Sequence, residues 1–321
     1  MIKRTFPMLL LLLMCAVLLT GCFTAPAARN ETPEGEGITE QPGENNNGEG
    51  GGQGGQEGTE QAGPKPQQAD LTLVKYDGGY FSVMLPQGWM IETMGQYTTF
   101  GFRAWNPQNP DYEIFWYGNL SPLLKSYEAK NNWASYVSQG GYPNAQLYAD
   151  APVINVYDAG SLFHEFQALG VLAGKYVPDF SIPALQNFTA IETMPLQTPY
   201  ASICTNEALI FASLQGRSGT PCHGKFTASI WNTQSYLVGN VDMAPTAALN
   251  VTGVIAPQAD FAAVQGVLTQ AVFSLAFSRE YMKEAMDHIR ATGEAALADN
   301  AARQAVYDAA NAAWDAYIRG G

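Results

Sequence analysis

The distribution of apolar and polar residues divides the 321-residue chain into four segments. An apolar run from Met8 to Leu19 lies near the N-terminus, and a polar stretch extends from residue 23 to about residue 70. Apolar and aromatic residues return over 71–278, and the remaining segment, 279–321, is rich in Ala, Glu and Asp. We therefore expect a signal, a linker, one folded domain and a helical tail.

Within residues 71–278, strand-like segments rich in β-branched and aromatic side chains are interrupted by helical periodicity. The strand-like segments are 71–86, 97–105, 111–119, 188–194, 207–214, 225–232, 235–243 and 249–256. The helical segments are 121–141, with Ser121 as N-cap and Pro122 in the first turn, 161–174, with Leu162, Phe163, Phe166 and Leu169 on one face, and 259–278. This order predicts an α+β domain with a mainly antiparallel sheet flanked by helices.

The N-terminal apolar run has the features of a secretory signal. It follows Lys3 and Arg4, and it is well short of the roughly 20 residues that span a bilayer. It ends in Leu19-Thr20-Gly21-Cys22, which resembles the lipobox of bacterial lipoproteins. The resemblance implies removal of residues 1–21, acyl chains such as palmitate on Cys22, and a lipid-anchored position on the extracytoplasmic face of the bacterial cell membrane.

Residues 22–70 predict a disordered acidic linker behind the lipidated cysteine. The stretch from Phe23 to Asp70 contains nine acidic and two basic residues, many glycines and few apolar side chains. Such a segment buries too little surface to offset chain entropy. Its charge and glycine content favour a solvated tether that extends from an anionic membrane.

Two pieces of the domain resemble a known family. The segment YFSVMLPQGW, Tyr80 to Trp89, is similar to the opening of PsbP-like domains, and VQGVLTQAVFSLAFS, residues 264–278, is similar to their closing helix. That resemblance implies a central antiparallel sheet flanked by helices, in a family of binding or assembly modules rather than enzymes. The whole chain, with IFWYG at residues 114–118, also resembles uncharacterised lipoproteins of low-GC monoderm bacteria, which imply no activity.

The tail, Arg279 to Ile318, consists mainly of strong helix formers and predicts one or two helices, with the break at Gly293. Its narrow apolar stripe consists of Met282, Met286, Ile289, Val306, Ala310, Ala313, Trp314 and Tyr317. A narrow stripe buries little surface, so we expect a helix separable from the domain. The stripe can pack along its own domain or against a partner helix.

The sequence contains no complete catalytic constellation. His164-Glu165 begins like a zinc-protease helix, but Ala168 occupies the position of the second histidine. We therefore predict no catalytic residue, no metal and no cofactor, and a non-catalytic module that binds an envelope protein or glycan. The alternative is an extracytoplasmic hydrolase built around Asp158, His164 and Glu165.

Two cysteines, Cys204 and Cys222, stay in the domain once Cys15 is removed and Cys22 acylated. An even number in an exported protein favours a disulfide between them. The hairpin formed by 207–214 and 225–232 instead places Cys222 beside Ser213, far from Cys204. Both the bonded and the reduced state stay open. His223 follows Cys222 directly, but neighbours on a strand point to opposite faces, which argues against a thiolate–imidazole pair.

Aromatic residues supply the candidate ligand site. Trp89, Trp105, Trp116 and Tyr117 would suit a groove for a sugar or a peptide, although large aromatic residues also fill cores. Residues 71–321 contain twenty acidic and twelve basic residues with no basic stripe, which argues against nucleic-acid binding.

Overall fold

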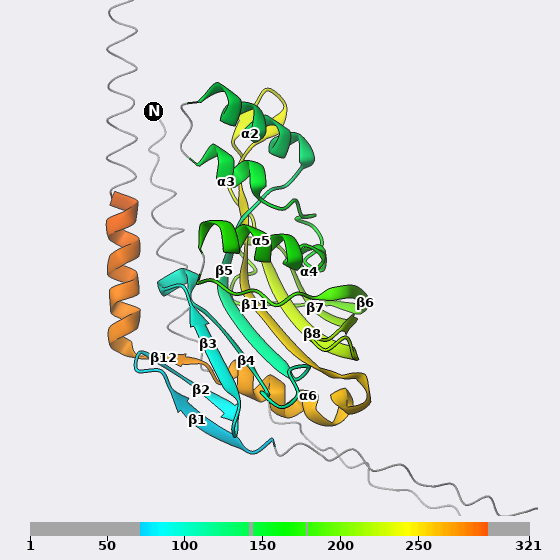
Figure 1. Ribbon diagram of the computed structural model, residues 1–321. Coiled ribbons are helices and arrows are strands. Elements are labelled where there is room, and N and C mark those ends of the chain that lie inside the picture. Colours follow the sequence, from blue (N-terminus) through cyan, green and yellow to red (C-terminus); the bar gives the residue numbers. More distant parts are fainter. Residues whose placement is uncertain (1–70, 141–143, 178, 295–321) are drawn as a thin grey trace, which may run out of the picture. The chain divides into compact units, whose positions relative to one another are not determined.

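The computed structural model describes residues 71–140, 144–177 and 179–294 (Figure 1). The predicted signal, Cys22, the acidic linker and the second half of the tail lie outside these residues, so their assignments stay predictions. No helix of the described part is long and apolar enough to cross a membrane.

A large antiparallel sheet forms the centre of the domain (Figure 1). Its strands are β3 (Met90–Met94), β4 (Gly101–Trp105), β5 (Glu113–Leu123), β6 (Gln186–Pro195), β7 (Cys204–Gln215), β8 (Pro221–Trp231) and β11 (Thr246–Pro257). Their order is β3-β4-β5-β11-β8-β7-β6. The predicted α+β class with a mainly antiparallel sheet is confirmed.

Smaller elements complete the domain. A second sheet has the order β1-β2-β12, and a two-stranded sheet joins β9 and β10. Their bounds are β1 (Leu73–Asp77), β2 (Phe81–Pro86), β12 (Ala276–Phe277), β9 (Leu237–Val238) and β10 (Val241–Asp242). The helical elements are η1 (Tyr97–Thr99), α2 (Tyr127–Gln139), α3 (Ala145–Asp150), α4 (Ser161–His164), α5 (Phe166–Tyr176) and α6 (Gln258–Phe273). Residues 279–294 form a further helix, drawn in deep orange.

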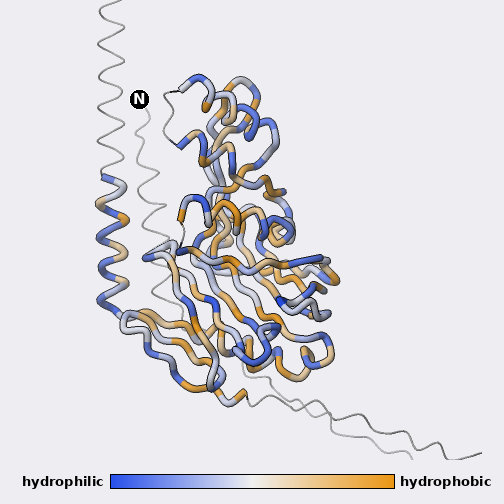
Figure 2. Tube along the Cα trace, in the orientation of Figure 1, coloured by the Kyte–Doolittle hydropathy of each residue, from blue (hydrophilic) through white to orange (hydrophobic). Residues whose placement is uncertain are grey.

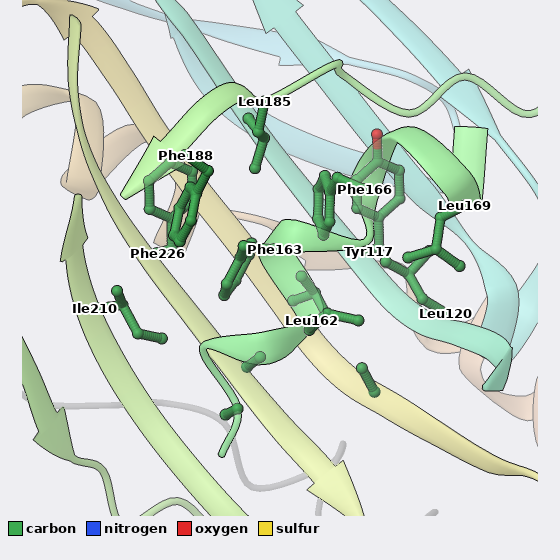
Figure 3. Packing of buried hydrophobic residues seen from close by; sticks show 14 of the residues in the cluster. Tyr117, Leu120, Leu162, Phe163, Phe166, Leu169, Leu185, Phe188, Ile210 and Phe226 are labelled. Carbon is green, nitrogen blue, oxygen red and sulfur yellow. The ribbon is translucent and has the colours of Figure 1, made fainter. Parts of the chain in front are cut away.

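Helices α4 and α5 cover one face of the large sheet (Figure 3). Phe163 packs against Phe226 and Phe188, with ring centroids 5.0 and 5.6 Å apart, and Phe166 packs against Phe115. The four residues predicted to share a helix face, Leu162, Phe163, Phe166 and Leu169, are all buried here. Burial of each such side chain contributes about 1.5–3 kcal/mol, so this cluster is a main source of stability.

Helix α6 and the β1-β2-β12 sheet cover part of the opposite face. Phe261, Val264 and Leu268 of α6 share a buried cluster with Phe81 of β2 and Phe102 of β4. Because α6 begins directly after β11 ends, it covers the part of the face near that end of the strand. Figure 2 shows apolar residues recurring along these strands beside polar ones, as expected for an antiparallel sheet that is not fully covered on both faces.

Several predicted boundaries differ from the structure. The predicted helix 121–141 begins late, because β5 continues to Leu123 and Ser126, rather than Ser121, accepts the hydrogen bond from the Ala129 amide that caps α2. The predicted strand 235–243 is a hairpin that turns at Gly239, where φ is +61°. The predicted helix 259–278 ends at Phe273, and β12 follows it by pairing with β2.

The first half of the tail contacts the domain. Tyr281 and Ala285 are buried, and Tyr281 packs against Phe277 and Tyr80. The narrow stripe that predicts a separable helix does not include Tyr281. The boundary after residue 278 stays a prediction, but residues 279–294 are a packed part of the structure.

Candidate ligand-binding groove

A largely apolar cavity of about 220 Å³ lies between the large sheet and the helix of residues 279–294. We call it the groove. Its lining consists of Tyr97, Thr98, Trp116, Gly118, Asn119, Tyr200, Trp231, Leu249, Phe277, Tyr281, Met282, Ala285, Met286 and Ile289. These residues come from η1, three strands of the large sheet, the loop before β7, β12 and the terminal helix. The groove is therefore assembled from segments that are far apart in the sequence.

The terminal helix forms one wall. Met282, Ala285, Met286 and Ile289 recur at helical spacing, so they lie on the same helix face, and all four line the groove. This face contains three of the apolar stripe residues that the sequence indicates. Part of the stripe is thus used within the domain.

Tyr281 attaches that wall to the rest of the domain. Its ring stacks on Tyr97, Phe277 and Tyr80, with centroids 5.4, 5.4 and 4.6 Å apart. Its hydroxyl accepts a hydrogen bond from the Tyr97 backbone N–H. His288, two turns further along the helix, also stacks on the Tyr97 ring at 4.8 Å. Burial raises the pKa of Tyr281, so its hydroxyl stays neutral at physiological pH.

The floor of the groove comes from β5, β11 and β8. Trp116 is fixed because its indole Nε1 donates to the Asn250 side-chain oxygen at 2.7 Å. Asn250 has a φ of +49° at a register shift between β11 and β8, so a bulge turns its side chain toward Trp116. Leu249 pairs with Asn119 on one side and with Ser229 on the other.

Two polar atoms of the floor have no partner. The Trp231 indole Nε1 and the Asn119 side-chain oxygen Oδ1 are buried and make no hydrogen bond in the described part of the chain. One is a donor and the other an acceptor. Both atoms have essentially no accessible surface, so neither faces the open space of the groove.

The loop between β6 and β7 supplies one further aromatic residue of the lining, Tyr200. Glu207, which is buried on β7, accepts hydrogen bonds from the Thr198 amide at 3.1 Å, the Thr198 hydroxyl and the Ser229 hydroxyl at 2.8 Å. The Thr198 hydroxyl in turn accepts from the Tyr200 amide at 3.0 Å. Glu207 thereby holds the loop that places Tyr200 in the groove. Burial raises the pKa of Tyr200, so this phenol is also neutral.

The groove has no charged lining. Its polar atoms belong to phenols, indoles, a threonine and an asparagine, and none of the lining residues is acidic, basic or a histidine. A charged ligand would lose its hydration without gaining an opposite charge, which is strongly unfavourable. The groove therefore suits an uncharged ligand.

Comparisons with known proteins give remote structural neighbours. No protein-family model and no curated protein sequence matches the chain. Cyanobacterial PsbP (CyanoP) from Synechocystis sp. PCC 6803 is 8% identical, covers 68% of this chain and 99% of its own, and has a TM-score of 0.30. LpqN, described as involved in cell envelope biogenesis of Mycobacterium tuberculosis, is 8% identical, with a TM-score of 0.27 and coverages of 64% and 90%.

A protein from Bacteroides thetaiotaomicron VPI-5482 is 10% identical, with a TM-score of 0.22 and coverages of 65% of this chain and 48% of its own. The neighbours thus include a PsbP protein, the family that both ends of the domain resemble. At these TM-scores the similarities support no inference about function.

The structure does not bring the four predicted groove residues together. Trp116 lines the groove, whereas Tyr117, its neighbour on β5, is fully buried on the other face and donates a hydrogen bond to the Ser181 carbonyl. Trp89 packs against the buried cluster that α6 shares with β2 and β4. Trp105 lies beside the guanidinium groups of Arg103 and Arg217. Alternation along a strand explains why Trp116 and Tyr117 point in opposite directions.

The two cysteines are also apart. Cys204 lies opposite Trp231 and Cys222 opposite Leu214, one position from the predicted partner Ser213, and both thiols are free. Burial raises the pKa of Cys204 to about 12 and that of Cys222 to about 11. In the structure both cysteines are therefore reduced and no disulfide joins them.

The alternative hydrolase nucleus lies on the opposite side of the sheet from the groove, near α4. The Asp158 side chain accepts the Gly160 amide and orders the turn before α4, while His164 contacts the edge of the Phe188 ring. A second, open depression includes His164, together with Lys130, Asp150 and Lys175, but neither Asp158 nor Glu165 lines it. Among the described residues no cluster of His, Cys, Asp and Glu could hold a metal ion.

Proposed function

We propose that the protein is a membrane-anchored extracytoplasmic lipoprotein whose domain is a non-catalytic binding module, with its ligand in the groove. The observation that carries this proposal is the groove itself, a cavity of about 220 Å³ lined by aromatic and apolar side chains and by no charged residue. A ligand that covers these side chains would remove their apolar surface from water, which contributes about 25 cal/mol per Å².

The chemistry of the lining favours binding over catalysis. Acid–base and nucleophilic catalysis depend on carboxylates, imidazoles, thiols or activated hydroxyls that titrate near the working pH. The ionisable side chains of the described lining are three phenols, those of Tyr97, Tyr200 and Tyr281, and burial raises the pKa of Tyr200 and of Tyr281. The groove resembles a recognition site in being aromatic, concave and uncharged.

The lipid anchor would keep this module at the membrane surface. Two or three acyl chains on Cys22 would hold the chain, since each buried CH₂ contributes about 0.8 kcal/mol. A Cys22→Ala variant should therefore leave the detergent-rich phase in phase separation, and equal partitioning with the wild type would contradict the anchor.

The groove can be tested with naphthalene, an uncharged probe of suitable size. The protein for this test is the chain of residues 22–321 with Cys22→Ala, which keeps every described residue and is not acylated. In equilibrium dialysis we expect saturable binding with one site per chain, and loss of that site in Met286→Trp, which fills the groove. Ala262→Trp, at an exposed position on α6, is the matched control. Binding that does not saturate, or that Met286→Trp leaves unchanged, would rule out the groove as the site.

A further inference from the structure

We infer that the ligand of the groove is a single-chain amphiphile, whose unbranched alkyl chain lies in the groove while its polar end stays in water. This inference rests on the proposed function and specifies the class of ligand. It is derived from the length of the groove, its volume, its lining and its opening to solvent.

The terminal helix sets the length of the groove. Met282 and Ile289 both line it, and they lie about two turns apart on one helix face. A helix rises about 1.5 Å per residue, so this apolar wall extends for roughly 10 Å along the helix axis. A chain that runs along the helix would contact Met282, Met286 and Ile289 in turn.

The volume of the groove matches one chain of moderate length. An apolar cavity of roughly 150 Å³ accommodates the six carbons of benzene. The groove, at about 220 Å³, accordingly holds roughly nine carbons. One alkyl chain uses this space along the helix, and a second chain of the same ligand would stay in water.

The side chains of the lining favour a flexible hydrocarbon. Met282 and Met286 are unbranched and have three rotatable bonds each, so they adapt to an irregular apolar partner. Leu249 and the rings of Trp116 and Trp231 provide an apolar floor. None of the lining residues is charged, so the part of the ligand that enters the groove carries no charge.

Several polar groups of the lining are not available to a ligand. Asn119 Oδ1 and Trp231 Nε1 are buried without accessible surface, and the Tyr281 hydroxyl already accepts the Tyr97 amide. A polar group inside the groove would lose its hydration with few partners to replace water, which is unfavourable. A hydrocarbon chain has no hydration to lose.

The opening of the groove accounts for the polar end of the ligand. The groove is a partly open cleft rather than an enclosed cavity. A ligand can therefore bury its chain against the terminal helix and keep its polar end hydrated. Burial of the chain provides the affinity, because each buried CH₂ strengthens binding by up to about fourfold.

A series of straight-chain alcohols tests the inference on residues 22–321 with Cys22→Ala. The probes are 1-butanol, 1-hexanol, 1-octanol, 1-decanol and 1-dodecanol, and displacement of naphthalene in equilibrium dialysis measures their affinities. We expect each added CH₂ to raise the affinity by up to about fourfold until the groove is full. The affinity should therefore rise through 1-octanol and differ little between 1-decanol and 1-dodecanol.

A substitution at one end of the groove should shorten it. Ile289→Trp fills the end of the wall that lies farthest from Met282. We expect 1-butanol to bind as before, whereas 1-octanol should lose about tenfold in affinity because part of its chain no longer fits. Lys283→Trp, at an exposed position on the same helix, is the matched control.

Two phospholipids with the same head group test the number of chains. These are 1-hexanoyl-lysophosphatidylcholine and dihexanoylphosphatidylcholine, each below the concentration at which it forms micelles. We expect similar affinities, since the groove holds one chain. If both chains entered the groove, the second would strengthen binding by about a hundredfold or more, and that result would contradict a single-chain ligand.

The outcomes separate the two proposals. If naphthalene itself fails to bind saturably, the proposed function is wrong. If naphthalene binds but the alcohols do not displace it, or if their affinity does not rise beyond 1-butanol or rises equally through 1-dodecanol, the ligand class is wrong while the groove stands as a site. The affinity of Ile289→Trp for 1-butanol reports whether its groove is still formed, and the alcohol series on the unsubstituted groove decides the inference by itself.

Discussion

The ring of Tyr281 stacks on that of Tyr97 with an interplanar angle of 25°, and the Tyr281 hydroxyl accepts the Tyr97 backbone N–H. This contact joins residues that are 184 positions apart and attaches the terminal helix to the start of the large sheet. Tyr97 has a φ of +53°, which is unusual for a residue with a side chain. The stack and the hydrogen bond fix this turn and the helix together.

Two substitutions of Tyr281 should therefore weaken the attachment of the helix to different extents. Tyr281→Phe keeps the stack and loses one hydrogen bond, and we expect a loss of about 1 kcal/mol in the free energy of unfolding. Tyr281→Ala also removes a buried ring, and we expect a loss of about 3 kcal/mol and no saturable naphthalene binding. Urea unfolding measures the first effect, and hydrogen exchange of residues 282–294 shows whether the helix opens. Lys283→Ala, an exposed neighbour, is the control, and equal stability of Tyr281→Ala and this control would contradict the attachment.

Glu207 should act on the groove through the loop that it holds. In Glu207→Gln an amide NH₂ replaces either the oxygen that accepts both the Thr198 and the Ser229 hydroxyls or the oxygen that accepts the Thr198 amide. We expect a loss of about 1–3 kcal/mol in stability, faster hydrogen exchange at the Thr198 amide, and weaker binding of naphthalene because Tyr200 is no longer fixed. Glu192→Gln, at an exposed position on β6, is the matched control. Unchanged exchange at Thr198 would show that the loop is held by other contacts.

Local patterns in the sequence predicted the parts of the fold that local patterns determine. The spacing of Leu162, Phe163, Phe166 and Leu169 predicted their common buried face, and β-branched segments predicted most strands. The start of α2 was misplaced because Ser121 followed by Pro122 satisfies the same capping rule that Ser126 fulfils in the structure. Only the extension of β5 through residue 123 decides between them, and that extension depends on pairing with β11.

The groove could be predicted only in small part. Its aromatic ring makes Trp116 a candidate, and helical spacing predicts the stripe of Met282, Met286 and Ile289. The places of Asn119 and Trp231 in the groove lining depend on which strands lie beside β11, and nothing in their local sequence distinguishes them. Aromatic character groups Tyr117 with Trp116, but strand alternation places Tyr117 on the other face.

The thiols of Cys204 and Cys222 should be free and unreactive in the folded protein. With pKa values of about 12 and 11, the thiolate fractions at pH 8 are roughly one in ten thousand and one in a thousand. We therefore expect almost no reaction of native residues 22–321 with Cys22→Ala toward Ellman's reagent, and two thiols per chain in guanidinium chloride without reductant. Cys204→Ser should lower that number to one. Absence of thiols in the denatured, unreduced chain would reveal a disulfide and contradict the structure.

Asp242 should make stability depend on pH in the acid range. Burial raises the pKa of this carboxyl, but hydrogen bonds from Lys125, the Tyr236 and Ala244 amides and Ser235 outweigh burial and lower it to about 2. A pKa that is lower in the folded chain than the ordinary 3.8 means that the carboxylate stabilises the fold above about pH 4. That stabilisation is lost as the pH falls from about 4 to 2.

The variant Asp242→Asn should accordingly be less stable than the wild type at pH 7, by about 1 kcal/mol for this partly exposed group. The difference should shrink as the pH falls below 4, because the wild-type carboxyl then becomes protonated and loses its advantage. Lys125→Met removes the ion-pair partner at 2.8 Å and should reduce the pH dependence without abolishing it, since the two amides and Ser235 still donate. Urea unfolding midpoints of the three proteins between pH 2.5 and 7 measure this effect. A difference between wild type and Asp242→Asn that stays constant over this range would show that Asp242 does not change its pKa on folding.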